Sequence, residues 1–137
     1  MGIIKVVCGI IYDNDKIFIC RRKEGKSLSG FWEFPGGKVE SNETDQVTLK
    51  RELQEELEME INIDSFIGQS NHDYGSFQIE LYGYSCSLIN YAGNLTDHDA
   101  YEWADIASLS AYKLAPADIP FIQMIENKKR SRTPKPY

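Results

Sequence analysis

Three glutamates, Glu52, Glu55 and Glu56, have the spacing in this chain that points most directly to chemistry. Offsets of three and four residues place their carboxylates on one face of a helix. Like charges gathered on one face destabilise a bare helix, whereas Mg²⁺ binds carboxylate oxygens readily and removes their repulsion. The surrounding segment, 36–60, holds eight acidic and three basic residues. We interpret it as a cation-binding segment in preference to an ordinary solvated helix face.

A glycine pair precedes this helix and could add main-chain ligands. Pro35, Gly36 and Gly37 end a short apolar strand on a backbone that is able to adopt positive φ. Glycine at this place also exposes its carbonyl oxygen to an approaching cation or ligand.

The remaining residues of the helix give it a second role. Arg51 can pair with a neighbouring carboxylate, for example Glu43, and hold the local geometry. Leu53 and Leu57 face away from the glutamates, toward a core. The pattern therefore predicts a helix with an acidic face and an apolar packing face.

The elements that must position this helix follow from hydrophobic periodicity and turn residues. We expect strands at 3–12, 16–21, 31–34, 61–70, 77–88 and 101–104, with the first two forming a hairpin. We expect helices at 44–58, 105–111 and 116–127. This order predicts an α+β domain in which strands and helices form an α/β/α layered sandwich.

Length and charge narrow the function classes. A chain of 137 residues fits one domain, which we place at 1–127, followed by a basic and flexible tail at 128–137. The net charge of −6 disfavours a protein that coats a nucleic-acid polymer. The sequence shows neither a signal-peptide layout nor an apolar run that could span a membrane. These features predict a cytoplasmic protein without a membrane partner.

The three cysteines, Cys8, Cys20 and Cys86, are far apart and have apolar neighbours. No CxxC pair is present, so a structural zinc site is not expected. We predict buried free thiols in a reducing compartment.

The segment FPGGKVESNETDQVTLKRELQEELEME resembles the Nudix box, G-x5-E-x7-R-E-U-x-E-E-x-G-U with U aliphatic. Gly37, Glu43 and the run that starts at Arg51 match the fixed positions. One position departs, because Glu58 stands where the family has a glycine that ends the helix. That change predicts a cost of roughly 1 kcal/mol or a shifted helix end, and it leaves the candidate cation ligands intact.

The resemblance extends over most of the chain. The segments VVCGIIYDNDKIFICRR, FWEFPGGKVE, YEW and LAPADIP are similar to the MutT-like branch of the Nudix hydrolases. WEF and LAPADIP are most similar to the bacterial CTP pyrophosphohydrolases. This resemblance implies a mixed β-sheet packed between helices and hydrolysis of a nucleoside triphosphate to the monophosphate and pyrophosphate. It also implies Mg²⁺ as cofactor, with Mn²⁺ as a substitute.

The same resemblance implies roles for individual residues. The catalytic set would comprise Glu52, Glu55, Glu56, Arg51 and Asp97. The cation ligands would come from Gly36, Gly37, Glu52, Glu55, Glu56 and Asp97. The substrate would contact Arg22, Glu33, Phe34, Gly36, Gly37, Lys38 and Asp118. Of these, Arg22 and Lys38 would contact phosphates, Glu33 and Asp118 would accept hydrogen bonds from an exocyclic amine, and Phe34 or nearby aromatics would stack on the base.

Several of these residues also have purely structural interpretations. Asp97 could be a loop acid that caps a turn, and Asp118 could favour the N-terminus of a helix after Pro116. Arg22 and Glu33 could be exposed strand residues. For His98 we favour a surface histidine over one that orients a neighbour. Tyr74, Phe77 and Tyr82 could border a pocket, although alternating strand aromatics are more often core.

Three functions are compatible with the sequence. The first is pyrophosphohydrolysis of CTP, dCTP or modified deoxynucleotides, as in sanitation of the nucleotide pool. The second is hydrolysis of another nucleoside diphosphate derivative, such as ADP-ribose or a dinucleotide, because the box handles only the pyrophosphate. The third is a non-catalytic nucleotide-binding module, which the intact glutamates disfavour. The oligomeric state, monomer or homodimer, stays open.

Overall fold

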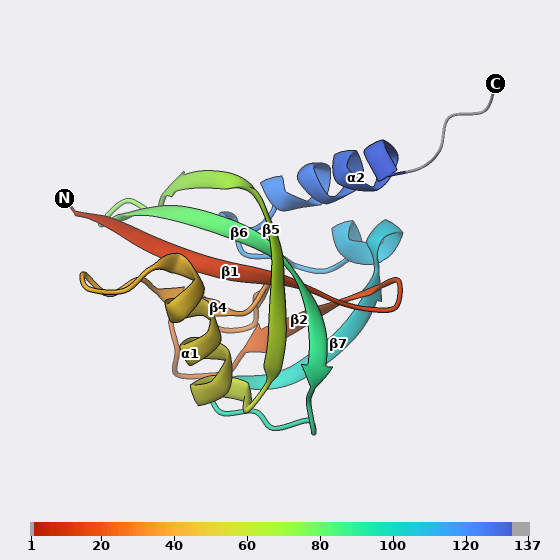
Figure 1. Ribbon diagram of the computed structural model, residues 1–137. Coiled ribbons are helices and arrows are strands. Elements are labelled where there is room, and N and C mark those ends of the chain that lie inside the picture. Colours follow the sequence, from red (N-terminus) through yellow and green to blue (C-terminus); the bar gives the residue numbers. More distant parts are fainter. Residues whose placement is uncertain (1, 133–137) are drawn as a thin grey trace.

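The computed structural model describes residues 2–132 of the chain. Its elements, in chain order, are β1 (Ile3–Asp13), β2 (Lys16–Arg22), β3 (Trp32–Glu33), β4 (Gly36–Lys38), α1 (Asp45–Leu57), β5 (Glu60–Asp73), β6 (Gln78–Asn90), β7 (His98–Asp105), the 3₁₀ helix η1 (Ile106–Ala111) and α2 (Pro120–Arg132). Figure 1 shows these strands forming one curved sheet, and α1 and α2 lie against it at different places.

The sheet is mixed and its strand order is β3-β2-β1-β6-β5. β1 and β6 pair in parallel over Ile3 to Tyr12, whereas β5 and β6 form a long antiparallel hairpin. The short strand β4 pairs antiparallel with β1, and β7 pairs antiparallel with β2. The N-terminal strand is therefore central and touches elements from both halves of the chain.

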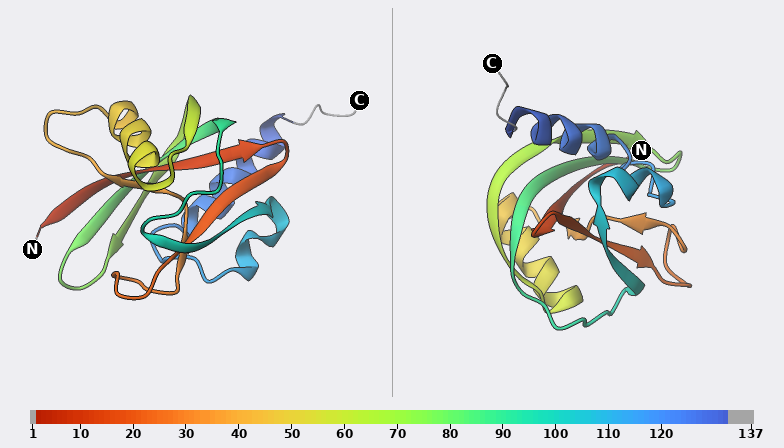
Figure 2. Two further views of the ribbon diagram at one scale, coloured as in Figure 1. Left: turned by 90° about the horizontal axis from the view of Figure 1, so that it is seen from below. Right: turned by 90° about the vertical axis from the view of Figure 1, so that its right-hand side faces the viewer.

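Both faces of the central strands are buried, and a helix covers each face. Val7 and Ile11 of β1 pack in a core with the α1 leucines. Cys8 and Ile10, which alternate with them, pack in a second core with Phe121 of α2. Because both faces of these strands are buried, the sequences of β1 and β2 contain continuous apolar runs that do not alternate with polar residues. The views in Figure 2 show α1 and α2 on opposite sides of the sheet, which confirms the predicted sandwich of a mixed sheet between helices.

Helix α1 begins and ends close to the predicted bounds. The side chain of Thr44 caps the helix by accepting from the Val47 N–H at 3.2 Å. Leu53 and Leu57 are fully buried, as predicted, whereas Val47 is 53% exposed. Glu58 takes the left-handed conformation in which the family has glycine, with φ at 51°. The helix thus ends where it was predicted to end, and Glu58 carries the strain.

Some boundaries differ from the predictions. Gly36 and Gly37 lie in the extended strand β4 and neither has the positive φ that was expected. Helix α2 begins at Pro120 and not near residue 116, and it continues to Arg132 instead of ending near residue 127. The first residues of the predicted flexible tail are therefore helical, and residues 133–137 lie outside the described part of the chain.

The three cysteines are free and buried, as predicted. Burial raises the pKa of the Cys8 and Cys20 thiols well above the ordinary value and that of Cys86 to about 12. Within residues 2–132, no helix is long and apolar enough to cross a membrane.

Candidate active site

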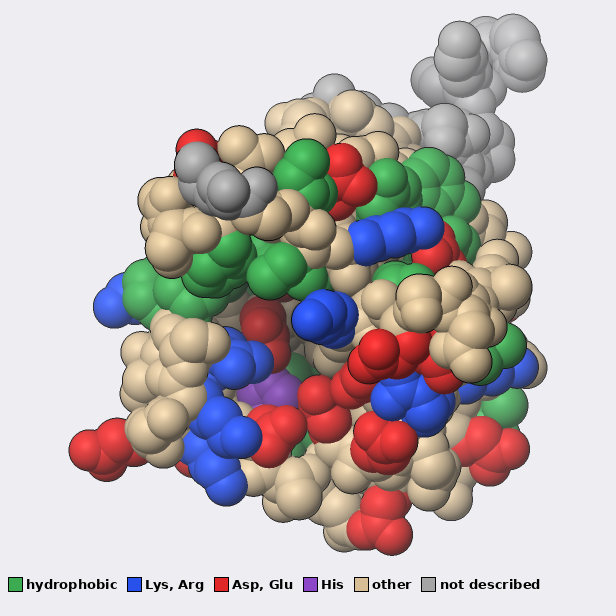
Figure 3. All heavy atoms as spheres, turned by 90° about the vertical axis from the view of Figure 1, so that its left-hand side faces the viewer, with side chains coloured by type: hydrophobic (Ala, Val, Ile, Leu, Met, Phe, Trp, Pro, Cys, Tyr) green, Lys and Arg blue, Asp and Glu red, His purple; other side chains and the backbone are tan. Residues whose placement is uncertain are grey.

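A cavity of about 650 Å³ collects most of the predicted site residues. Its walls come from β1, the end of β2, β3, β4, α1, the β5–β6 hairpin, Asp97 just before β7 and the turn at residues 115–118. Figure 3 shows acidic and basic side chains gathered around a hollow on this side of the molecule. The predicted residues that line the cavity are Arg22, Glu33, Phe34, Gly36, Gly37, Lys38, Glu52, Glu56, Asp97 and Asp118.

Gly36 and Gly37 are required by close approach and not by positive φ. A Cβ on Gly36 would lie 1.9 Å from the carbonyl oxygen of Val7, since β4 runs tightly beside β1. A Cβ on Gly37 would lie 2.3 Å from the carboxyl carbon of Glu52. Gly36 therefore lets β4 lie against β1, and Gly37 lets the backbone of β4 lie against the acidic face of α1.

Glu52 and Glu56 lie one helical turn apart and both line the cavity. Burial, with Glu52, Glu33 and Asp97 as acidic neighbours, raises the pKa of Glu56 to about 9. Glu55 is 60% exposed and is not among the residues that line the cavity. The structure thus brings two of the three glutamates together in the cavity and leaves the third, Glu55, outside its lining.

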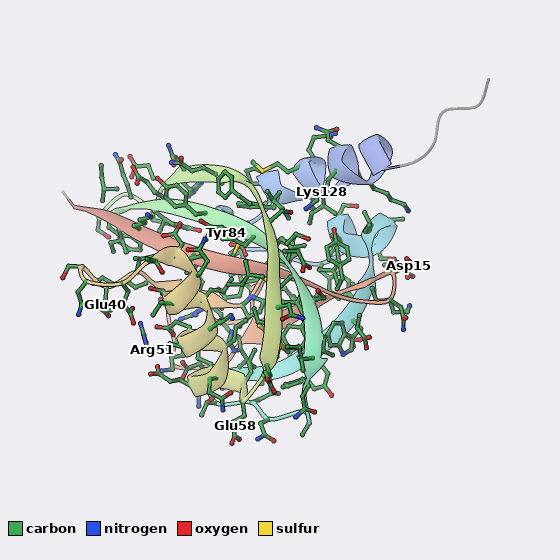
Figure 4. The ribbon with its side chains drawn as sticks, viewed as in Figure 1. Asp15, Glu40, Arg51, Glu58, Tyr84 and Lys128 are labelled. Atoms are coloured by element: carbon green, nitrogen blue, oxygen red, sulfur yellow. The ribbon has the colours of Figure 1, made fainter. Side chains whose placement is uncertain are left out.

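Arg51 organises this acidic face from outside the cavity. Its guanidinium donates to both carboxylate oxygens of Glu43, at 2.8 and 2.7 Å, and also reaches Glu52 and Glu55 at 3.2 Å. The two-pronged pair with Arg51 lowers the pKa of Glu43 to about 2. The predicted pairing of Arg51 with Glu43 is confirmed. Figure 4 shows Arg51 beside the middle of α1 and Glu58 near its end.

Asp97 lies directly before β7 and is close to the acidic face of α1. It lines the cavity and contributes to the raised pKa of Glu56. Its carboxylate lies 3.3 Å from the Lys26 ammonium, while its carbonyl oxygen accepts from the Lys23 N–H. The interpretation of Asp97 as a turn cap receives no support from these contacts. Lys38 lies on β4 beside Gly37, and it adds a positive charge to the cavity wall.

The other end of the cavity is built around Glu33. Glu33 Oε2 lies 2.8 Å from His98 Nε2 and 3.2 Å from an Arg22 guanidinium nitrogen. The prediction of a surface histidine is wrong, because the His98 side chain has no exposed area. Its burial depends on the pairing of β7 with β2, where His98 lies opposite Arg22. Arg22 also donates to the carbonyl oxygen of Ser27 at 2.6 Å, so it is not a solvated strand end.

Asp118 is buried in the turn before α2 and lines the same cavity as Glu33. Its Oδ2 accepts from the Phe34 N–H at 2.9 Å, across 84 residues of sequence. Burial, with Glu33 as an acidic neighbour, raises the pKa of Asp118 well above the ordinary value. Because α2 begins at Pro120, Asp118 precedes the helix and serves β3 instead of the helix N-terminus.

Aromatic side chains form the apolar part of this end. Tyr74 and Phe77, from the hairpin that joins β5 to β6, line the cavity, whereas Tyr82 does not. The Phe34 ring is buried edge to face against Phe121 at 6.4 Å, so its role as a stacking surface stays a prediction. The burial of His98 could not be predicted from the sequence, because no local pattern around it signals burial.

This fold and cavity agree with the comparisons with known proteins. The model of the family described as NUDIX domain matches residues 6–124, so the chain belongs to the Nudix hydrolase family. It is 32% identical over 123 residues to the CTP pyrophosphohydrolase of Escherichia coli (strain K12), which covers 90% of this chain and 91% of that protein. It is also 39% identical over 77 residues to an 8-oxo-dGTP diphosphatase of Proteus vulgaris, which covers 56% and 69% of the two chains.

Among solved structures, the solution structure of the E. coli ORF135 protein matches with a TM-score of 0.82 and 31% identity. The match covers 98% of this chain and 96% of that one. The chain is thus an enzyme of the Nudix hydrolase family, and enzymes of this family use divalent metal ions.

Proposed function

We propose that the chain is a Mg²⁺-dependent nucleoside triphosphate pyrophosphohydrolase that acts on CTP, dCTP or modified deoxynucleotides. The reaction converts a triphosphate and water to the monophosphate and pyrophosphate. One observation carries the proposal: a single cavity is lined by the acidic pair Glu52 and Glu56 and also by the carboxyl groups of Glu33 and Asp118. A nucleotide presents both a polyphosphate, which binds cations, and a base, which can offer hydrogen-bond donors.

We call Glu52, Glu56 and Asp97, together with Gly36 and Gly37, the acidic end of the cavity. These residues offer the ligands that Mg²⁺ prefers. Glu52, Glu56 and Asp97 supply carboxylate oxygens, and Gly36 and Gly37 supply main-chain carbonyls. Unbalanced acidic charge at this end, visible in the raised pKa of Glu56, fits a group that takes a cation. A bound divalent cation would neutralise phosphate charge and lower the pKa of water. We keep Glu55, which is exposed on the same helix, as a further candidate ligand.

Basic residues in the cavity would complete the phosphate path. Lys38 lies on β4, next to the glycine that faces Glu52, and its ammonium is suited to a phosphate oxygen. Phosphoryl transfer depends on positioning and charge neutralisation more than on covalent chemistry. Arg51, fixed by Glu43, would position Glu52 and Glu55 without touching the substrate.

Glu33 and Asp118, with the residues that hold them, form what we call the base end of the cavity, and they would recognise the base. Glu33 and Asp118 are both carboxyl groups, and an exocyclic amine offers the hydrogen-bond donors that such groups accept. Cytosine and guanine both carry such an amine, which is consistent with the names of the two relatives. We favour cytidine nucleotides because the more extensive match is to a CTP pyrophosphohydrolase.

A panel assay tests this proposal. It would measure release of pyrophosphate and monophosphate from CTP, dCTP, 5-methyl-dCTP, 5-hydroxy-dCTP, 8-oxo-dGTP and GTP, with ADP-ribose and NADH as competing classes. We expect hydrolysis of the cytidine forms with Mg²⁺, loss in Glu56→Gln, and full activity in Glu60→Gln, an exposed glutamate outside the cavity. Preference for ADP-ribose or NADH would keep the acidic end and contradict the base assignment.

A further inference from the structure

We propose that His98 is a positioning residue for base selection. It holds one oxygen of Glu33 and leaves the other as the acceptor for the exocyclic amine of the base. The inference rests on the proposed function and deepens it, because it explains how the same cavity would separate an amine-bearing base from one that bears a carbonyl.

The contacts of Glu33 are one-sided. His98 Nε2 lies 2.8 Å from Oε2, and an Arg22 nitrogen lies 3.2 Å from the same atom. Within the described part of the chain, Oε1 makes none of the hydrogen bonds of this side chain. Glu33 lines the cavity. The carboxylate is therefore clamped through one oxygen, with its second oxygen left for a ligand.

The environment of His98 fixes its hydrogen on the side of Glu33. The imidazole has no exposed area, and within residues 2–132 its Nδ1 has no hydrogen-bond partner. A hydrogen on Nδ1 would be buried without an acceptor, which is unfavourable. With the hydrogen on Nε2, Nε2–H donates to Glu33 Oε2, and no N–H is buried without an acceptor.

The position of His98 at the start of β7 gives it this role. The pairing of β2 with β7 is irregular between Arg21 and Arg22, and Arg22 lies opposite His98. Asp97, one residue earlier, lines the cavity near Glu56. Neighbouring residues of one strand end thus serve the base end and the acidic end of the same cavity.

This arrangement favours an amine over a carbonyl. An amine donates to the available oxygen of Glu33, whereas a carbonyl at the same place would face a carboxylate with no hydrogen between them. A site built around a specific hydrogen bond rejects an analogue that lacks the group. If Glu33 could rotate, the same carboxylate would adapt to other ligands and the selection would weaken.

The experiment compares CTP with UTP, which differ at this group. We would measure kcat and KM on both nucleotides for the wild type, His98→Phe, His98→Gln and His98→Asn. The glutamine amide reaches about as far as Nε2 and restores the donor, whereas the asparagine amide stops short of it. Asp99→Asn is the matched control, because Asp99 lies on the same strand and pairs outside the cavity with Arg21.

We expect His98→Phe and His98→Asn to lower the ratio of kcat/KM for CTP over UTP by roughly tenfold. The loss should lie mainly in the KM for CTP, while kcat changes little. His98→Gln should retain most of the ratio, and Asp99→Asn all of it. Thermal melting of each variant shows whether it is folded, and His98→Asn keeps the comparison open if the phenylalanine variant does not fold.

Two results would overturn the inference alone: an unchanged ratio in folded His98→Phe or His98→Asn, or an equal loss on both nucleotides that glutamine does not restore. A wild type that hydrolyses neither nucleotide would overturn the proposed function first, and the inference with it. These failures are distinguishable, because only the last is seen before any variant is compared.

Discussion

The two ends of the cavity are built in different ways. Most of the acidic end comes from one stretch of sequence, since β4 and α1 follow one another between Gly36 and Leu57, and Asp97 is added from the segment before β7. The base end joins residues that are far apart, since Glu33 and His98 are separated by 65 positions in the sequence and Phe34 and Asp118 by 84. One end depends on local helix geometry, and the other depends on how the strands pair.

The charges of the two ends also differ. At the base end each carboxyl group has a donor, from His98 and Arg22 to Glu33 and from the Phe34 N–H to Asp118. At the acidic end, Glu56 is buried beside other acidic groups, Glu52 and Asp97 among them, and these raise its pKa. The base end is therefore organised before a ligand arrives, whereas the acidic end is suited to a cation that balances its charge.

Removing one carboxylate from the acidic end should have the largest effect. We expect Glu56→Gln to lower kcat on every substrate by at least ~100-fold, because several kcal/mol of charge stabilisation are lost. The same variant should melt at a higher temperature in a metal chelator, because it removes a buried acid from like charges. Steady-state kinetics and thermal melting test both parts. A variant that loses activity and also melts earlier would contradict the electrostatic explanation.

Substitution of the adjacent glycines Gly36 and Gly37 should have different effects, one mainly on stability and the other mainly on activity. Gly36→Ala places a methyl group against the Val7 backbone and should destabilise the fold by about 1–3 kcal/mol or more. Gly37→Ala places it against the Glu52 side chain, which can move. That variant should fold and lose about 10- to 100-fold in activity, because Glu52 is displaced. Urea unfolding and kinetics on both variants provide the test, and equal destabilisation would refute the distinction.

Substitutions of Asp118 test whether the base end is held in place by its own hydrogen bonds. Asp118→Asn keeps an oxygen that can accept from the Phe34 N–H, whereas Asp118→Ala leaves that N–H buried without a partner. We expect the alanine variant to lose about 1–3 kcal/mol in the free energy of unfolding and the asparagine variant to lose little. Both should change base preference on the nucleotide panel while leaving cation affinity unchanged. A loss of cation affinity would show that the two ends are not separate.

The Arg51–Glu43 pair should make a contribution to the stability of the fold that depends on pH. The pKa of Glu43 is about 2 in the folded chain against an ordinary 4.5, so the pair stabilises the fold above pH 4.5. That contribution should disappear as the pH falls from about 4.5 to about 2. Glu43→Gln should flatten this part of the profile of melting temperature against pH. An unchanged profile would assign acid unfolding to other carboxylates.

Glu58 should give the smallest effect. Glu58→Gly removes the strain of a left-handed residue with a side chain and should stabilise the fold by about 0.5–1 kcal/mol. Glu58→Ala keeps the strain and loses the hydrogen bond from Asn94, so it should not stabilise. Activity should stay the same in both, since Glu58 lies outside the cavity. Urea denaturation compares the three proteins, and a stabilised alanine variant would contradict the role of φ.

The acidic helix could be predicted from the sequence because its geometry is local. The i, i+3 and i, i+4 offsets, the Thr44 cap and the buried leucines follow from helical periodicity alone. The same logic could not predict that Glu55 lies outside the cavity, because this depends on how α1 is rotated against β4. It also could not predict that Gly36 and Gly37 lie in a strand, since their tight contacts come from β1 and α1.

The sequence by itself thus determined the helix, its acidic face, the buried cysteines and the family. The tertiary structure decided which groups share the cavity: His98 is buried only because β7 pairs with β2, and Asp118 reaches Phe34 only because the chain returns to β3. The physical reason is the distance along the sequence over which each kind of interaction acts. Helix offsets and caps act within a few residues, whereas a hydrogen bond between distant strands exists only after the whole sheet has formed.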